Sequence, residues 1–290
     1  MKLSVSSYSF SAYLREGRLT NGQLPKKAAE MGFDAIEYVD LPQGEQSERL
    51  ELARRLRAAA DEAGIPICAY AIGASLYHTE RAACEAEIAR LQGEVDIAEA
   101  LGARVMRHDV CYKIDPAARS FGRMLPLIAE NARRVTEYAA ARGIRTCTEN
   151  HGFIAQDSIR VEALFNEVAH ENYGLLVDIG NFICADEDSV TAVSRVAPYA
   201  VHAHAKDFFY RSFAEGTAEG FFETRGGNFV CGAPLGEGVI PVAQCLRILQ
   251  KAGYDGYLSL EYEGKADCIE GIAKGLAFLR RTLRTTNSEQ

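Results

Sequence analysis

The chain has 290 residues, 48% hydrophobic and 25% charged, which is enough to bury a large core as one big α/β domain or two smaller ones. Its formal net charge of −8 is unlike the basic balance of nucleic-acid-binding domains, so we expect no nucleic-acid partner. The sequence has no apolar run long enough to span a membrane, and its N-terminus lacks the apolar segment of a signal peptide. Eight cysteines without a CxxC pair favour a reducing compartment, and we expect a cytoplasmic protein without a membrane partner.

Apolar strand-like runs alternate with helical patterns along the whole chain. Strands are expected at 3–8, 35–39, 66–72, 104–108, 145–149, 174–178, 200–205 and 257–261. Helices, several of them ending at a glycine, are expected at 20–31, 47–63, 80–101, 116–142, 158–170, 189–197, 241–252 and 268–283. Eight strand-then-helix units predict a single (β/α)₈ TIM barrel in the α/β class, with one domain over 1–290. An open doubly wound sheet is the alternative, but no GxGxxG fingerprint follows the first strand.

The alternation breaks after the seventh strand. Residues 207–238 contain seven aromatic residues and seven glycines, and they show no convincing helix or strand pattern. Long loops inside compact domains are usually lids or binding loops. We therefore expect an extended loop or lid here.

Four residue types that bind metals stand where four successive strands end. Glu149, Asp178, His204 and Glu261 end the strands numbered five to eight in the predicted barrel. The active site of such a barrel lies at the C-terminal ends of its strands, so these side chains should converge on one rim. We interpret them as ligands of one divalent metal.

This ligand set is rich in oxygen. Three carboxylates and one imidazole suit Mn²⁺ best, with Mg²⁺ or Co²⁺ as alternatives. A structural zinc site would favour cysteines in a closed tetrahedron, and the sequence has no such cluster.

Such a site suits proton transfer beside a carbonyl group. The metal, chelated by the carbonyl and a neighbouring hydroxyl, stabilises an enediolate while carboxylates on opposite faces exchange the proton. Return of the proton to the same carbon gives epimerisation, return to the neighbouring carbon gives isomerisation, and loss of a β-hydroxyl gives dehydration. The leading hypothesis is a divalent-metal-dependent sugar isomerase or epimerase acting on a keto-sugar, aldose or polyol. The alternative is a dehydratase or lyase acting on an inosose or a 3-keto-glycoside, including C-glycoside cleavage with a partner subunit.

The ordered motifs resemble those of the xylose-isomerase-like sugar phosphate isomerase/epimerase superfamily. The resemblance rests on GFDAIE at 32–37, GEG at 236–238, AGYDGY at 252–257 and the strand-end ligands, and it extends over nearly the whole chain. It implies the same four metal ligands, with Glu149 and Glu261 as the acid/base pair of epimerase members. It also implies a carbohydrate substrate and a homo-oligomer, either a dimer or a tetramer, with a hetero-oligomer possible.

The chain departs from the superfamily in one place. Many epimerase members have a substrate-binding histidine three residues after the strand-six aspartate, where this chain has Asn181. Asn181 can still bind a hydroxyl group, and His151 can supply an imidazole. The superfamily's histidine-rich DNA-repair endonucleases do not fit, because only six histidines are present and the second Asp-x-His is missing.

Further residues have both a functional and a structural interpretation. Lys206 is a candidate for substrate contact or for a rim ion pair, and His108 for substrate contact or for a structural role. Glu37 is expected to bind sugar hydroxyls or to pair with a nearby cation. Arg225 belongs either to a substrate-binding loop or to a turn. His202 is expected to be a core histidine or a neighbour of the ligand shell. A non-catalytic barrel subunit is the rival from another functional class, and the complete ligand set argues against it.

Overall fold

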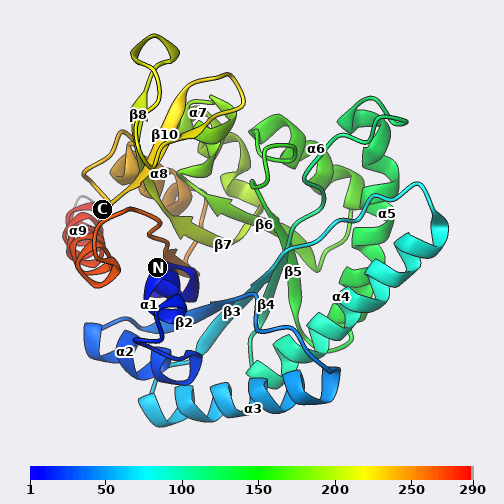
Figure 1. Cartoon of the computed structure of the whole chain (residues 1–290), viewed down its shortest axis with the longest axis horizontal. Coiled ribbons are helices and arrows are strands. Elements are labelled where there is room, and N and C mark those ends of the chain that lie inside the picture. Colours follow the sequence, from blue (N-terminus) through cyan, green and yellow to red (C-terminus); the bar gives the residue numbers. More distant parts are fainter. Residues whose placement is uncertain (289–290) are drawn as a thin grey trace.

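The computed structural model describes residues 1–288 and the side chains of residues 1–284. Eight parallel strands close into a barrel, as predicted, in the order β1-β11-β7-β6-β5-β4-β3-β2. The barrel strands are β1 (Lys2–Ser6), β2 (Ala35–Val39), β3 (Ile67–Ile72), β4 (Val105–His108), β5 (Arg145–Glu149), β6 (Tyr173–Asp178), β7 (Ala200–Ala205) and β11 (Tyr257–Leu260). Figure 1 shows helices surrounding these strands on the outside.

The helices cover the barrel as the periodicity predicts. They are α1 (Ser11–Arg15), α2 (Leu24–Met31), α3 (Gln46–Ala63), α4 (Arg81–Leu101), α5 (Phe121–Ala140), α6 (Ser158–Val168), α7 (Ser189–Val196), α8 (Val242–Lys251) and α9 (Cys268–Ser288). Gly102 ends α4 with a φ of 77°, a left-handed conformation that glycine adopts without steric cost. In the described part of the chain, no helix is long and apolar enough to cross a membrane.

Helix α5 begins five residues later than the sequence predicts. Residues 116–118 form a turn, and Arg119 has a left-handed φ of 67°, which a helix does not accommodate. The Ser120 side chain then caps the helix by accepting a hydrogen bond from the backbone N–H of Arg123.

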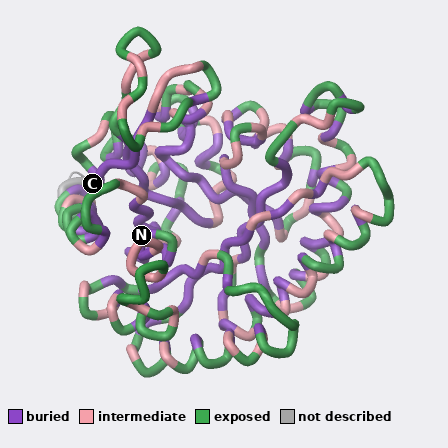
Figure 2. The backbone as a smooth tube through the Cα atoms, viewed as in Figure 1, coloured by how far each residue is buried: buried purple, intermediate pink, exposed green. Residues whose placement is uncertain are grey.

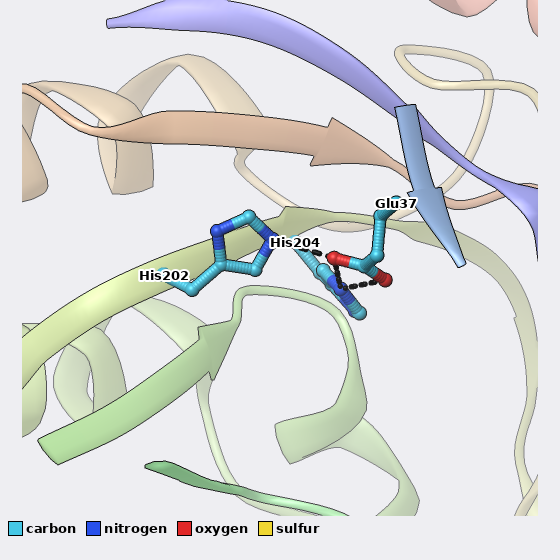
Figure 3. A group of neighbouring side chains, drawn as sticks. All are labelled: Glu37, His202 and His204. Atoms are coloured by element: carbon cyan, nitrogen blue, oxygen red, sulfur yellow. Dashed lines mark hydrogen bonds and ion pairs between the residues drawn. The ribbon is translucent and has the colours of Figure 1, made fainter. Parts of the chain in front are cut away.

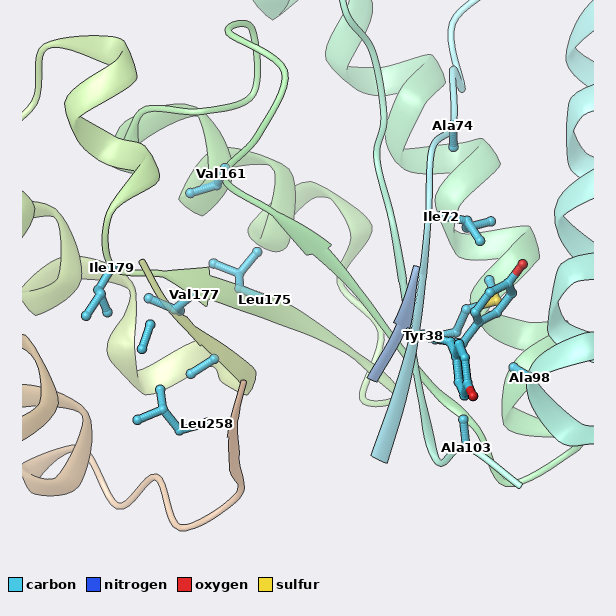
Figure 4. Close-up of a cluster of buried hydrophobic side chains, with 14 of the residues drawn as sticks. Tyr38, Ile72, Ala74, Ala98, Ala103, Val161, Leu175, Val177, Ile179 and Leu258 are labelled. Carbon is cyan, nitrogen blue, oxygen red and sulfur yellow. The ribbon is translucent and has the colours of Figure 1, made fainter. Parts of the chain in front are cut away.

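The main hydrophobic core lies between the barrel strands and the helices. Side chains such as Leu175 and Val177 of β6 and Ile72 of β3 point outward into this layer (Figure 4). The barrel strands are buried along their lengths, whereas the outer faces of the helices are exposed (Figure 2). The barrel interior is more polar, and it is this face of the strands that presents the site.

The prediction that residues 207–238 contain no regular structure is wrong. These residues, here called the excursion, form a three-stranded antiparallel sheet in the order β8-β10-β9, built from β8 (Asp207–Arg211), β9 (Phe222–Glu223) and β10 (Phe229–Ala233). Figure 1 shows it standing away from the barrel beside α7 and α8. The strands are short, their side chains are partly exposed and glycines lie between them, so the sequence lacks clear alternation.

Asp207 fixes the base of the excursion. Its carboxylate accepts hydrogen bonds from the backbone N–H groups of Phe208 (2.8 Å), Gly236 (2.9 Å), Gly238 (3.0 Å) and Ile240 (3.0 Å). Gly238 fits so closely that a Cβ atom there would lie 2.2 Å from the Asp207 Oδ1 atom. The first and last residues of the excursion are therefore held together by one side chain.

We expect Asp207→Asn to lower the free energy of unfolding by about 1–3 kcal/mol, because the new amide nitrogen would face backbone donors that need an acceptor. Urea unfolding followed by circular dichroism measures this change. Glu219→Gln is the matched control, since that side chain is 98% exposed and on the same excursion. Equal stability of the two variants would contradict the role given to Asp207.

Candidate metal centre

The four predicted ligands converge at the C-terminal rim of the barrel. Single ligand atoms of Glu149, Asp178, His204 and Glu261 all lie within 4.8 Å of one another, and all four residues are buried. The His204 Nδ1 atom is 3.6 Å from Glu149, 3.7 Å from Asp178 and 3.5 Å from Glu261. These separations are too long for good hydrogen bonds, so the atoms face a common point without satisfying one another.

Backbone contacts at the strand ends place the carboxylates. The side chain of Asn150 bridges the ends of β5 and β6 through both backbone groups of Asp178 (2.9 Å each). The Asp178 Oδ1 atom accepts hydrogen bonds from the backbone N–H groups of Gly180 and Asn181, which leaves Oδ2 toward the cluster. The backbone N–H of Glu261 continues the pairing of β11 with β7 by donating to the Ala205 carbonyl.

Glu37 orients the histidine ligand from below. Its carboxylate accepts from the Nε2 atom of His204 at 2.9 Å and lies 2.5 Å from the Nε2 atom of His202 (Figure 3). With the Nε2 proton directed at Glu37, the Nδ1 lone pair of His204 faces the other ligands, the arrangement that metal-binding histidines adopt. His202 therefore lies behind the ligand shell, one of the two places the sequence suggested for it.

The residues present fit a divalent cation. The His204 Nδ1 and Asp178 Oδ2 atoms are buried and have no hydrogen-bond partner among the described residues. Burial lowers the pKa of His204, but Glu37, Glu261 and Glu149 outweigh it and raise that pKa well above its usual value. Six carboxylates surround two permanent cations in this region. When the histidines are neutral, the negative charges exceed the positive ones by four. The carboxylates belong to Glu37, Asp109, Glu149, Asp178, Glu261 and Glu263, and the cations are Arg107 and Lys206. So many negative charges in and beside a buried site require positive compensation, which a bound dication would supply.

Two buried cations hold the carboxylates that were predicted as the acid/base pair. The Arg107 guanidinium is 2.6 Å from Glu149, and the Lys206 ammonium is 2.5 Å from Glu261. Glu149 also accepts a hydrogen bond from the Asn181 side chain at 2.9 Å. Burial raises the pKa of Glu149, but Arg107 and His204 outweigh it and lower that pKa. Both carboxylates are thus stabilised in the charged form that ligands need.

Arg107 and Asp109 are site residues that the sequence reasoning missed. Arg107 pairs in register with Cys147, two residues before Glu149 on the interior face of β5. Its guanidinium also lies 2.8 Å from Asp109. Strand alternation was the signal that could have identified Arg107. Side chains alternate between the two faces of a strand, and a charged side chain on the interior face of β4 needs a partner inside the barrel.

His151 forms a pair with Asp109 beside the cluster. Its Nδ1 atom is 3.0 Å from the Asp109 carboxylate, whose other oxygen accepts a hydrogen bond from the Tyr112 hydroxyl at 2.6 Å. Burial lowers the pKa of His151, but Asp109 outweighs it and raises that pKa. The pKa of Asp109 falls to about 2, because the charges of Arg107 and His151 overcome its burial.

Two adjacent cavities that share lining residues lie at the cluster. An inner chamber of about 180 Å³ is lined by Arg107, Asp109, Glu149, His151, His204, Lys206 and Glu261, among others. An outer cavity of about 470 Å³ is lined by Tyr8, Tyr112, Phe153, Gln156, Asn181 and Phe222, among others, and it shares His151 and Lys206 with the inner chamber. His151, Lys206 and Asn181 therefore lie where a substrate can reach them.

Three predicted substrate contacts have protein partners and do not line these cavities. His108 is on the helix-facing side of β4, where its Nδ1 atom bonds the Asp109 carbonyl at 2.9 Å, because alternation gives the interior position to Arg107. Glu37 is fully buried against His202 and His204. Arg225 pairs with Asp157 at 2.7 Å and donates to the carbonyl of Phe153.

The Glu37 contact predicts a loss of metal affinity in Glu37→Gln. One carboxylate oxygen becomes an amide donor facing a histidine donor, so His204 loses its fixed orientation. Removal of such supporting groups typically costs about 10–100-fold in affinity. Calorimetric titration of the metal-stripped protein with Mn²⁺ measures the loss, and Glu219→Gln is the charge-matched control. Unchanged affinity would show that Glu37 does not orient the ligand.

The His151–Asp109 pair predicts a pH dependence in the metal-free protein. Because the folded pKa of His151 is raised, its pairing contributes stability that is complete below about pH 6.5 and is lost as pH rises through the folded pKa. NMR titration of the imidazole should give a pKa above about 6.5, and Asp109→Asn should lower it. A wild-type value at or below that of free histidine would refute the pairing.

Comparisons with known proteins agree with this architecture. The chain matches the family model described as xylose isomerase-like TIM barrel over residues 25–282. An inosose dehydratase from Lacticaseibacillus casei is 24% identical over 175 residues, which are 56% of this chain and 55% of that protein. The match therefore spans about half the length of the curated relative.

Solved structures share the fold over nearly the whole chain. A xylose isomerase-like TIM barrel protein from Mycobacterium smegmatis in complex with magnesium has a TM-score of 0.74 at 17% identity, covering 98% of this chain and 97% of that one. The 3-keto-D-glucoside 4-epimerase of E. coli has a TM-score of 0.72 at 15% identity, covering 97% of this chain and 99% of that one. By its family match, the chain belongs to the xylose isomerase-like TIM-barrel family.

Proposed function

We propose that the chain is a metal-dependent carbohydrate enzyme that removes a proton from the carbon beside a carbonyl group and then eliminates a β-substituent. The observation that carries the proposal is the buried set of Glu149, Asp178, His204 and Glu261. Within the part of the chain that the structure describes, two of their ligand atoms lack a hydrogen-bond partner. A divalent ion held there would polarise the substrate carbonyl and stabilise the enolate charge. Mn²⁺ is our first choice of metal for this oxygen-rich set.

His151 is the group that we assign to proton transfer. Its ring lines both cavities, and its Nδ1 atom is fixed by Asp109, which leaves Nε2 as the nitrogen for a substrate. The neutral imidazole takes the proton at Nε2, while Asp109 stabilises the imidazolium that forms, as a fixed carboxylate does for a general base. The broken C–H bond supplies the electron pair of the new C=C bond.

Lys206 is the group that we assign to the leaving substituent. Its ammonium lines both cavities and lies within 4 Å of Asp178, Glu261 and Glu263, so it is held at the border between them. Lys206 donates a hydrogen bond to the departing oxygen. As the C–O bond breaks, that oxygen takes up the proton of this hydrogen bond. Loss of hydroxide, protonated to water, makes the reaction a dehydration. The dehydratase name of the Lacticaseibacillus casei relative supports this outcome.

Epimerisation or isomerisation is the second candidate. It needs two proton-transfer groups on opposite faces of the substrate, and Glu149 and Glu261 are the two carboxylates available. Their short contacts with Arg107 and Lys206 favour the charged state of both, which suits ligands better than proton carriers. The fold shared with the 3-keto-D-glucoside 4-epimerase keeps this candidate open.

Metal analysis and a solvent-exchange assay test the proposal together. Wild type should bind about one divalent ion tightly, and Asp178→Asn should lose it, as measured by elemental analysis and Mn²⁺ titration. Incubation with inososes and 3-keto-glucosides in D₂O should then give elimination products by NMR. Deuterated epimers without elimination would select the second candidate, and equal metal binding by the two proteins would contradict the proposed function.

A matched pair of histidine variants tests the proton-transfer assignment. We expect His151→Gln to keep the metal and to lose about 10²–10⁴ in kcat, the usual contribution of a positioned acid or base. His78→Gln is the control, because His78 lines neither cavity. Full activity of His151→Gln would remove His151 from the mechanism.

A further inference from the structure

The outer cavity is larger than the chamber in which the proposed chemistry occurs. The inner chamber of about 180 Å³ is lined by three of the four candidate ligands, Glu149, His204 and Glu261, and the adjoining outer cavity measures about 470 Å³. Small-molecule sites usually measure roughly 300–1,000 Å³, so the outer cavity alone has room for a substantial chemical group. The two spaces share five lining residues: Tyr8, Tyr112, His151, Lys206 and Glu263. A group in the outer cavity can therefore be joined to the one that reacts.

Aromatic side chains gather around this cavity. Among the described residues seven aromatic side chains are markedly exposed, and four of them line the outer cavity: Tyr8 (43%), Tyr112 (49%), Phe153 (41%) and Phe222 (38%). They come from four separate segments, after β1, after β4, after β5 and from the excursion. Exposed aromatic surface gathered in this way is characteristic of a binding site.

Three polar side chains of the outer cavity, Gln156, Asn181 and Tyr112, are already engaged with the protein. Gln156 uses both ends of its amide, accepting from the Phe153 backbone N–H (2.5 Å) and donating to the Asn181 carbonyl (2.9 Å). The Asn181 side chain donates to Glu149 and accepts from Lys206, and the Tyr112 hydroxyl donates to Asp109. A second sugar would need donors and acceptors for its hydroxyl groups, whereas these rings offer apolar faces.

The protein holds Phe153 in an unfavourable backbone conformation. Its φ is 66°, which a bulky residue rarely adopts. The Phe153 carbonyl accepts hydrogen bonds from Arg225 of the excursion, and its N–H donates to Gln156. Strain that the surrounding contacts maintain is typical of ligand clamps. Arg225 thus joins the excursion to the wall of the outer cavity that presents this ring.

We propose that the outer cavity is a subsite for a flat aromatic substituent on the substrate. The substrate class is then a keto-sugar linked to an aryl group, with the sugar in the inner chamber and the aryl ring among Tyr8, Tyr112, Phe153 and Phe222. This inference rests on the proposed function for the position of the sugar ring. If elimination removes an aryloxy substituent, the C–O bond to the sugar breaks, its electron pair leaves with the oxygen, and that oxygen receives the proton that Lys206 donates.

Binding of unreactive glycosides tests the subsite without requiring turnover. The probes are phenyl β-D-glucoside, methyl β-D-glucoside and cellobiose, titrated calorimetrically into Mg²⁺-loaded protein. We expect the phenyl glucoside to bind at least about tenfold more tightly than the other two, which corresponds to about 1.4 kcal/mol. Phe153→Ala and Phe222→Ala should each remove most of this preference and leave the affinity for the methyl glucoside unchanged.

Phe213→Ala is the matched control. This phenylalanine is on the same excursion and 75% exposed, but it does not line the outer cavity, so the preference should persist. Thermal unfolding confirms that each variant is folded. Equal affinity for phenyl and methyl glucosides, tighter binding of cellobiose, or no detectable binding of the phenyl glucoside would overturn the subsite. Failure of the proposed function would instead appear in the metal content of Asp178→Asn, which these titrations do not use.

Discussion

The site depends on the burial of like charges at one rim of the barrel. Register brings Asp178 opposite His204 in neighbouring strands, and the strand ends carry Glu149 and Glu261 to the same layer. Carboxylates this close repel one another in a medium of low dielectric, so folding costs free energy unless positive charge enters. Arg107 and Lys206 supply part of it, and the His204 and Asp178 atoms without a hydrogen-bond partner among the described residues mark where a dication would supply the rest.

That charge balance separates the roles of the acidic residues. A carboxylate within 2.6 Å of a buried guanidinium or ammonium group is stabilised as an anion, and exchange of a proton there works against the ion pair. His151 is placed differently, with one nitrogen fixed by Asp109 and its ring facing both cavities. In our proposal the candidate ligand shell and the proton-transfer group are therefore distinct sets of residues, and this separation underlies our preference for elimination over two-faced proton exchange.

The sequence predicted the barrel and the convergence of four candidate ligands because both follow from local patterns. Helix periodicity and glycine ends located the helices, and Glu149, Asp178 and His204 are the last or penultimate residues of apolar strands. Arg107 was missed because His108 stands at the end of β4 and drew the assignment, and the register with β5 shows that Arg107 is the one that faces the interior. The excursion was missed because β8 and β10 pair with each other across an interval without clear alternation. Its form depends on long-range contacts, such as those of Asp207 with residues 236–240.

In our proposal, the excursion connects the fold to the choice of substrate. The strand that bears His204, β7, ends at Ala205. Lys206 follows it, and Asp207 begins the excursion, so the chain enters the excursion from within the site. Farther along the excursion, Arg225 donates a hydrogen bond to the carbonyl of Phe153, and Phe222 lines the outer cavity with Phe153. These contacts place the far side of the excursion over the loop that follows Glu149. One wall of the outer cavity thus derives from the barrel and the other from the excursion. Changes in the excursion can therefore alter which substituent binds while the ligands below keep their geometry, a division of labour that the barrel fold permits because its loops vary independently of its strands.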